Sequence, residues 1–361
     1  MKKIFLIIIC IVAVAVFAFF AFRPTYQSTD PRPVVRIGAS LPLTGDLAAL
    51  GQSVKAGLVM ALSEIPADSR YRYEIIFEDD RYNMRKAITN THRLISARRV
   101  NAILYMFDSS IVAAPILEKH RIPGMGCTWG AMPFIGMEYS FNHYSRPKAQ
   151  VQAFIEMLQA RNIKSVAAVM QNSASIVEMR EYLEQFAPQN GIELSVTNVN
   201  FGVKDYRIDI ERIRQQNPDI VMLQLLDPEL GIFIKQANEL NLNIPLTSID
   251  EFAHIVDRSA LEGSVFVTSL SGDDDFRARF AEHSNLTMKS CTANIYDNFK
   301  ILVSIYESSD RKLTGTEVKD RLYQIRDFPS ALGVNISVDE DGIIDSPLIR
   351  VRIENGQVVR E

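Results

Sequence analysis

The chain has 361 residues, 47% of them hydrophobic, which is an ordinary proportion for a protein with a buried core. Its 39 lysine and arginine residues face 43 aspartate and glutamate residues, so the formal net charge is −4. Because both signs are mixed along the chain, no basic surface of the kind that binds nucleic acid is expected, and we expect no nucleic-acid partner.

Residues 1–24 are predicted to be a signal anchor or a signal peptide. Lys2 and Lys3 precede an unbroken apolar run over residues 4–22, which approaches the roughly 20 residues that a membrane-spanning helix needs. The run is longer than the core of a cleaved signal, and its only A-x-A pattern, residues 13–15, lies inside it. We therefore favour an uncleaved anchor in the cytoplasmic membrane with the rest of the chain outside the cytoplasm, in the periplasm or at the cell surface. A cleaved signal and a lipoprotein anchored at Cys10 are the alternatives.

Beyond the apolar run, short β-rich segments alternate with amphipathic helical patterns, which is typical of parallel sheets flanked by helices. The predicted strands are residues 34–40, 73–77, 102–105 and 122–126 in the first half, and 165–170, 193–199, 219–223 and 245–249 in the second. The predicted helices are residues 84–98, 148–160, 176–186, 206–215 and 229–240. This repeated order predicts an α/β protein with two doubly wound parallel-sheet lobes, and residues 140–147 are a plausible crossover between them.

Two local signals are sharper than the general pattern. The turn after the first strand contains Gly45 and Gly51, which we expect where the backbone bends or passes close to another segment. Near the end, a long helix over residues 292–308 is followed by two strands that Asn355 and Gly356 separate, and Asn-Gly is a strong hairpin signal.

Cys127 and Cys291 are the two cysteines outside the apolar run. They could pair in an oxidising compartment, but two cysteines define no disulfide framework. Two buried free thiols are therefore the preferred interpretation.

The start of the exported body resembles leucine/isoleucine/valine-type periplasmic binding proteins, the solute-binding components of ABC transporters. The matching residues are Ile37, Gly38, Pro42, Leu43, Thr44, Gly45, Ala48, Gly51, Gly57 and Glu64. The resemblance continues through residues 77–95, 108–123, 217–245 and 293–309. It implies a type I periplasmic binding protein fold, with two lobes that a hinge joins and a C-terminal part that returns to complete both. On this basis residues 34–142 plus 268–328 form lobe 1, and residues 143–267 plus 329–361 form lobe 2.

In open α/β sheets, ligands bind beyond the carboxyl ends of the strands, so the loops after each strand are the candidates. Asp108, Ser109 and Ser110 follow the strand at residues 102–105 and begin a helix. The resemblance implies that this loop holds the carboxylate of the ligand, which serine hydroxyls and free N–H groups would suit. The alternative is that Asp108 or Ser109 only caps the helix.

The next loop contains Thr128 and Trp129, the only tryptophan in the chain. Trp129 could stack on a flat or cationic ligand, or it could simply fill the surface of a lobe. In the second half, the resemblance places an acidic residue for an ammonium group near Asp250, with Glu251 next to it. A solvated turn is the alternative there, and His254 could also reach the cleft.

Leu225 and Leu226 occupy positions where relatives often carry an aromatic residue, so we expect a more apolar site, or one shaped for another acid or an amide. No metal-site spacing, no catalytic motif and no cofactor motif is present, and we expect a binding protein rather than an enzyme. The expected role is capture of a small amino acid, carboxylate or amide for an ABC permease and its ATPase subunits. A membrane-anchored sensor of the same fold is the alternative.

Overall fold

The computed structural model describes residues 30–130, 134–255 and 257–361. The predicted membrane anchor over residues 4–22 lies outside the described residues. Within the described ranges, no helix combines the length and the apolar composition that crossing a membrane requires. Residues 34–361 form one compact unit.

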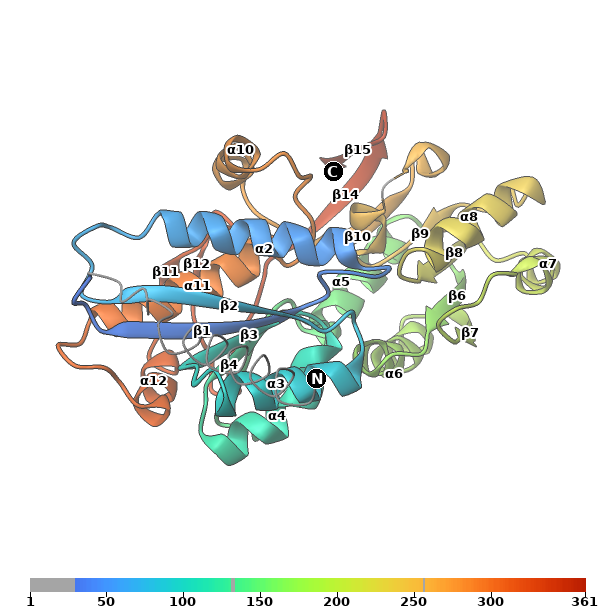
Figure 1. Ribbon diagram of the computed structural model, residues 1–361. Coiled ribbons are helices and arrows are strands. Elements are labelled where there is room, and N and C mark those ends of the chain that lie inside the picture. Colours follow the sequence, from blue (N-terminus) through green and yellow to red (C-terminus); the bar gives the residue numbers. More distant parts are fainter. Residues whose placement is uncertain (1–29, 131–133, 256) are drawn as a thin grey trace, which may run out of the picture. The chain divides into compact units, whose positions relative to one another are not determined.

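Five strands from the first half of the chain and one short strand from near its C-terminus build a parallel sheet of six strands (Figure 1). Its order is β13-β5-β4-β3-β1-β2, so the sheet runs outward in both directions from β1 and β3. The strands are β1 (Val34–Leu41), β2 (Arg72–Asp79), β3 (Ala102–Tyr105), β4 (Gly124–Gly126), β5 (Ser140–His143) and β13 (Ile343–Ile344). Most side chains of β1 and all those of β3 are buried, as expected for strands covered on both faces.

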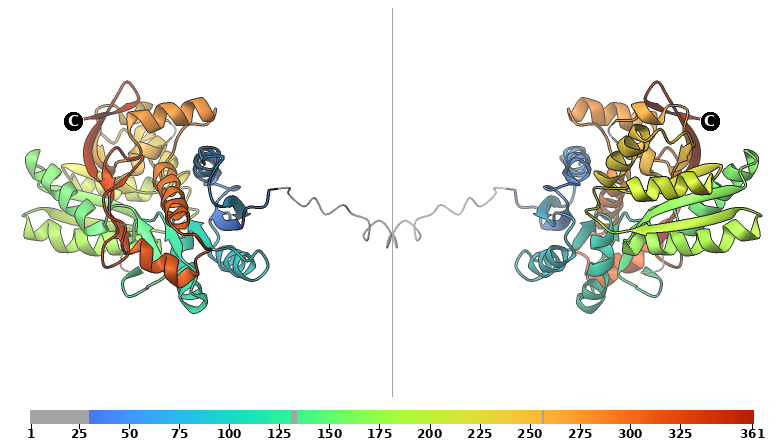
Figure 2. Two further views of the ribbon diagram at one scale, coloured as in Figure 1. Left: turned by 90° about the vertical axis from the view of Figure 1, so that its left-hand side faces the viewer. Right: turned by 90° about the vertical axis from the view of Figure 1, so that its right-hand side faces the viewer.

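Helices cover both faces of this first sheet. On one face, α2 (Ala48–Ser63) contacts α11 (Thr292–Glu307), and the two run side by side in Figures 1 and 2. On the other face, α3 (Met84–Ser96) contacts α4 (Asp108–His120). The arrangement is doubly wound, as the sequence pattern predicted. The short helix α12 (Gly315–Leu322) contacts α11 and begins with a capping box between Thr314 and Glu317.

The second sheet has four parallel strands in the order β7-β6-β8-β9. They are β6 (Ser165–Gln171), β7 (Glu193–Val199), β8 (Ile220–Gln224) and β9 (Leu246–Thr247). The surrounding helices are α5 (Pro147–Ala160), α6 (Ala174–Gln189), α7 (Arg207–Gln216) and α8 (Glu229–Glu239). Here too the order reverses between the first and third strands, β6 and β8.

The C-terminal part of the chain adds one strand to the first sheet and forms a separate three-stranded sheet. After α9 (Glu251–His254) and the 3₁₀ turn Ser259–Leu261, β10 (Val265–Ser269) pairs antiparallel with the hairpin of β14 (Leu348–Glu354) and β15 (Gln357–Arg360). A single bridge, Ile249 to Val267, connects this sheet to the end of the second sheet. Between β10 and β14 the chain forms α10 (Asp274–His283), α11, α12, the small pair β11 (Phe328–Pro329) and β12 (Asn335–Ile336), and β13.

Strand β13 pairs with β5, so residues 343–344 belong to the first sheet although their stretch was assigned to lobe 2. The return of the C-terminal part to the first sheet is confirmed. Towards the second sheet it forms a separate three-stranded sheet linked by one bridge, so completion of both lobes and the lobe boundaries stay predictions. Strand β5 itself was expected to be part of a crossover, because residues 140–147 are polar and end in proline. Ser140–His143 contains three polar residues and one apolar one. Its strand conformation comes from pairing with β4 and β13 on either side.

Both glycine predictions are confirmed. Gly45 has a φ of +91°, which a residue with a side chain rarely adopts, and a Cβ on Gly51 would lie 2.1 Å from the carbonyl oxygen of Pro42. The Asn355-Gly356 hairpin is confirmed as well, with φ values of 51° and 71° at the two turn residues.

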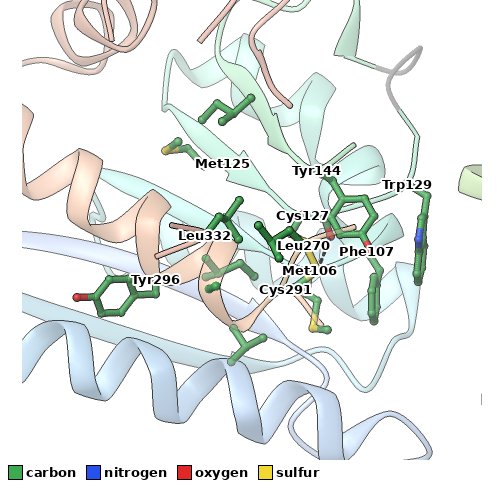
Figure 3. Close-up of a cluster of buried hydrophobic side chains, with 14 of the residues drawn as sticks. Met106, Phe107, Met125, Cys127, Trp129, Tyr144, Leu270, Cys291, Tyr296 and Leu332 are labelled. Carbon is green, nitrogen blue, oxygen red and sulfur yellow. Dashed lines mark hydrogen bonds between the residues drawn. A yellow bond between two sulfur atoms is a disulfide. The ribbon is translucent and has the colours of Figure 1, made fainter. Parts of the chain in front are cut away.

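The preference for free thiols at Cys127 and Cys291 is wrong. The two residues form a disulfide with Cα atoms 5.8 Å apart, across a sequence separation of 164 residues (Figure 3). The bond joins the loop after β4 to the residue that precedes α11. Sequence spacing could not show this proximity, because it arises only when α11 packs against the first sheet.

Candidate ligand-binding cleft

Loops at the carboxyl ends of the strands converge on two adjoining cavities. From the first sheet come Asp46 and Leu47 after β1, and Asp108 after β3. From the second sheet come Ser173 after β6 and the stretch Leu226 to Pro228 after β8. These are the loops next to the points where the strand order of each sheet reverses, which is where ligands bind in open α/β sheets. The fold alone therefore selects this cleft as the candidate site.

We call the two cavities the Glu251 cavity and the Tyr82 cavity. The first has a volume of about 970 Å³ and the second about 840 Å³. They share a wall of Asp46, Leu47, Leu226, Asp227 and Pro228, so they are two parts of one cleft. Volumes of this size suit a small organic ligand.

The serines predicted to bind a carboxylate point elsewhere. The hydroxyl of Ser109 donates to Asp80 Oδ2 at 3.0 Å, and that of Ser110 donates to the carbonyl oxygen of Phe107 at 2.6 Å. Both are buried, and neither lines the Glu251 cavity or the Tyr82 cavity. The capping alternative is also wrong, because α4 begins after Phe107 without a side-chain cap. Asp108 does line the Tyr82 cavity and accepts a hydrogen bond from the hydroxyl of Tyr82 at 3.3 Å.

Trp129 and Asp250 are brought together, but both are buried inside the protein. Figure 3 shows Trp129 beside Phe107. Trp129 is 2% exposed, stacks on Phe107 at 4.9 Å between ring centroids, and has the edge of Tyr144 against it. Its indole N–H donates to Asp250 Oδ2 at 3.1 Å. Neither residue lines a cavity of the cleft, and neither does the neighbouring Thr128, whose buried hydroxyl has no hydrogen-bond partner among the described residues.

Asp250 is fully buried and its carboxylate is already surrounded by donors. Besides Trp129, it accepts hydrogen bonds from Gln150 Nε2 at 2.8 Å, Thr268 Oγ1 at 3.0 Å and the backbone N–H of Ser269 at 2.5 Å. Burial raises the pKa of Asp250, and the hydrogen bonds from Ser269 and Thr268 oppose that rise. The carboxylate therefore holds protein segments together instead of facing the cleft.

Glu251, the second acidic candidate, does line the Glu251 cavity. Its side chain is 3% exposed, and its Oε1 accepts a hydrogen bond from Gln224 Nε2 at 2.9 Å. Burial raises the pKa of Glu251 well above its ordinary value, and the charges of Asp250 and Asp227 raise it further. Leu225 is fully buried in the core of the second sheet, whereas its neighbour Leu226 lines both cavities.

Three more ionisable groups surround the inner part of the Glu251 cavity. Burial raises the pKa of Asp227, and the positive charge of Lys289 opposes that rise. Burial lowers the pKa of Lys289, as does the charge of Arg258, while Asp227 acts in the opposite direction. Burial, with Lys289 and Arg258, lowers the pKa of His254 to about 3, so its imidazole is neutral at pH 7. His254, for which the sequence left a place in the cleft open as one possibility, thus lines the Glu251 cavity without charge.

Sequence reasoning missed Asp227, Lys289, Tyr82 and Phe201. Tyr82 follows β2 and Phe201 follows β7, and their rings meet edge to face at 6.0 Å across the Tyr82 cavity. Asp227 follows β8, so the strand-end rule applied to every strand would have found these three residues. Lys289 carries no such signal, because it precedes α11 and reaches the cleft only through the tertiary fold.

Two parallel sheets that present their strand-end loops to one charged cleft define the class of two-lobed solute-binding proteins. The sequence pattern of the periplasmic binding protein family matches residues 34–357, and the chain belongs to that family.

The relatives that match this chain in sequence are named as homologues of Leu/Ile/Val-binding proteins. The chain is 25% identical over 224 residues to Leu/Ile/Val-binding protein homolog 7 of Brucella abortus, and 23% identical over 233 residues to homolog 8 of the same organism. Each match covers 57% of this chain and 55% of the relative. The chain thus spans about half the length of these relatives.

Solved structures agree with this fold over most of the chain. The leucine binding protein LivK of Thermotoga maritima has a TM-score of 0.83 at 20% identity, covering 91% of this chain and 97% of its own. LivJ of Streptococcus pneumoniae, in complex with isoleucine, has a TM-score of 0.79 at 18% identity, with 91% and 100% covered. A solute-binding protein of Rhodopseudomonas palustris, in complex with 3,4-dihydroxybenzoic acid, has a TM-score of 0.81 at 17% identity, with 91% and 95% covered. These similarities confirm the type I periplasmic binding protein fold.

Proposed function

We propose that this chain is an extracytoplasmic solute-binding protein that captures a small organic ligand in the cleft and delivers it to an ABC permease. The observation that carries the proposal is the convergence of loops from both sheets on one cleft lined by buried ionisable groups. Family membership and the similarity to proteins in complex with isoleucine and 3,4-dihydroxybenzoic acid support a small solute as the ligand.

Delivery to a permease follows from how such a cleft works. A ligand that contacts loops from both sheets stabilises the arrangement in which the sheets face each other, so binding changes the surface that a membrane partner meets. The apolar run at residues 4–22 would hold the protein near that partner at the membrane. The permease channel and its ATPase subunits would be other chains.

A thermal-unfolding screen of the purified chain tests the binding function. The panel contains amino acids, primary amines, amides and aromatic acids, each well above its expected dissociation constant. A ligand at 100 times its dissociation constant should stabilise the native state by about 2.7 kcal/mol, which shifts the melting temperature measurably. Stabilisation by none of these solutes would contradict a solute-binding role.

Delivery is tested separately, by uptake of the identified solute into cells that have or lack the chain. We expect uptake at low solute concentration to fall when the chain is absent and to return when it is restored. Binding without any change in uptake would reject transport and leave the membrane-anchored sensor as the function of the same fold.

A further inference from the structure

We propose that the ligand is a monocation with an apolar body, such as a primary alkylamine, and that Glu251 binds its ammonium group. This inference rests on the proposed solute-binding function and specifies its substrate class. It begins from Glu251, whose Oε1 is held by Gln224 at 2.9 Å. No hydrogen bond or ion pair to its other oxygen occurs among the described residues, although the side chain is 3% exposed and lines the cavity.

A buried carboxylate without a cationic partner is costly, because a charge in a low-dielectric site needs compensation. The charged groups that act on Glu251 are Asp250 and Asp227, and both are carboxylates. The nearest cation of the cavity, Lys289, acts on Asp227 instead and donates to the carbonyl oxygen of His254 at 3.4 Å. Arg258 is directed away, to the carbonyl oxygens of Phe252 and Ala253.

The charges of the ionisable groups in the inner part of the Glu251 cavity indicate the sign of the charge that the ligand should carry. Asp227 and Glu251 are negative when ionised, Lys289 is positive, and the imidazole of His254 is neutral because its pKa is lowered to about 3. When Glu251 ionises, its charge therefore has no cation to compensate it, and burial and the neighbouring carboxylates raise its pKa. A monocation neutralises that charge, whereas a zwitterion brings no net charge and an anion adds repulsion.

His254 supplies a second polar atom for the same group. It lies three residues after Glu251 in α9, so the two side chains lie on neighbouring positions of one helical turn. Its Nε2 is buried and has no hydrogen-bond partner among the described residues. An ammonium group has three hydrogens to donate, and a neutral imidazole nitrogen and a carboxylate oxygen are both acceptors.

The rest of the cavity wall suits an apolar body. Aliphatic side chains from the loop after β1, α2, the loop after β8, α8 and the segment after α9 line the space, among them Leu47, Leu50, Leu226, Leu230, Ile234 and Ile255. The serine hydroxyls expected to bind a carboxylate are occupied inside the protein. The cleft thus provides acceptors and apolar surface, but no free pair of hydroxyl donors for an acid group in the Ser109 loop.

Three compounds with the same branched alkyl body test the ligand class by calorimetric titration of the purified chain. They are 3-methylbutylamine, leucine and 4-methylpentanoate, which carry a cation, a zwitterion and an anion. We expect the amine to bind at least about tenfold more tightly than the other two, a difference of about 1.4 kcal/mol. Binding of leucine or the acid in preference to the amine would overturn the inference and leave the solute-binding function standing. Absence of binding by all three would reject the inference, and only silence across the wider screen would also reject the function.

The Glu251→Gln variant tests the residue, because glutamine keeps the shape and removes the charge. We expect amine affinity to fall roughly 30-fold or more, the usual result of removing one partner of a buried charge pair. Glu239→Gln is the control, since Glu239 lines the same cavity but is solvent-exposed and paired with Lys235 at 3.9 Å. Equal affinities in the two variants would contradict the assignment.

A measurement on the unaltered protein covers the case in which Glu251→Gln fails to fold. The amine keeps its proton up to a pH of about 10, so a change in affinity between pH of about 6 and about 8 reports groups of the protein. Glu251 faces Asp250, Asp227, His254 and Lys289, and its raised pKa means that ionisation is completed only as the pH rises. Amine affinity should therefore increase as the pH rises over this interval, and a constant or falling affinity would overturn the inference.

Discussion

At the residue scale, Asp250 shows how a candidate binding residue can instead be structural. Its carboxylate accepts hydrogen bonds from Trp129 in the loop after β4, Gln150 in α5, and Thr268 and Ser269 at the end of β10. These segments come from different parts of the sequence, and each donates a hydrogen bond to this carboxylate. The charged group is tolerated without exposure because its donors replace the water that burial removes.

We predict that Asp250→Asn lowers the free energy of unfolding by about 3 kcal/mol, because an amide NH₂ would face donors that now meet an oxygen. Urea unfolding followed by circular dichroism measures the loss, and the fluorescence of Trp129 reports the same transition locally. Asp257→Asn is the control, since Asp257 is solvent-exposed, and it should change stability by less than about 0.5 kcal/mol. Equal stabilities of the two variants would show that the network contributes nothing.

At the element scale, the Cys127–Cys291 disulfide ties the loop after β4 to the start of α11. The helix α11 is buried along most of its length and packs against α2 and the strands β3, β4 and β5. A covalent link at its first turn therefore fixes the helix against the sheet whose loops carry the first half of the cleft.

Replacement of both cysteines by serine should lower the free energy of unfolding by about 3–5 kcal/mol, as expected for a bond that closes a long loop. Thermal and urea unfolding measure the effect. Wild-type protein that is reduced under denaturing conditions should match the double variant. Peptide mapping that finds alkylated Cys127 and Cys291 in unreduced, denatured protein would contradict the disulfide.

Most elements could be predicted from the sequence, because their hydrophobic periods agree with what the fold requires. The strand at residues 102–105 is fully apolar and has the predicted bounds, and the helix from Met84 keeps its apolar stripe. The short strands β5 and β13 could not be predicted, since they gain their conformation only from pairing with neighbours. Length and periodicity carry no information about such strands.

The candidate site was predictable to a smaller extent. The position of Asp108 and Glu251 after strands identified them, and both line the cleft. The side-chain directions of Ser109, Trp129 and Asp250 depend on partners such as Asp80, Phe107 and Gln150, which tertiary folding alone brings close. The position of a loop in the sequence therefore predicts at which end of the sheet the loop lies, but not which of its side chains faces the ligand.

At the scale of the whole molecule, side chains from loops of the two sheets meet across the cleft. Tyr82 and Phe201 form one such contact, with rings 6.0 Å apart at an angle of 65°. Phe201 remains 46% exposed, so it contributes little to the core of its own sheet. The pair is therefore suited to hold the two sides of the cleft together without being needed for folding.

We predict that Phe201→Ala speeds the dissociation of 3-methylbutylamine by about 2- to 10-fold, which corresponds to the 0.5–1.5 kcal/mol of an aromatic pair. Stopped-flow measurement of dissociation tests this, and the melting temperature of the empty protein should change little. Ile208→Ala removes a more exposed side chain, 77% accessible, that lies on α7 away from both cavities. If both variants release the amine at the wild-type rate, the contact has no role in retaining the ligand.

The most direct test of the account is a crystal structure of the protein with 3-methylbutylamine bound. We predict that the amine lies in the cleft between the two sheets, with its nitrogen within hydrogen-bond distance of Glu251 and its alkyl body against Leu47 and Leu226. Density for the amine outside the cleft, or a nitrogen bound to Asp250 after displacement of Trp129, would contradict the account.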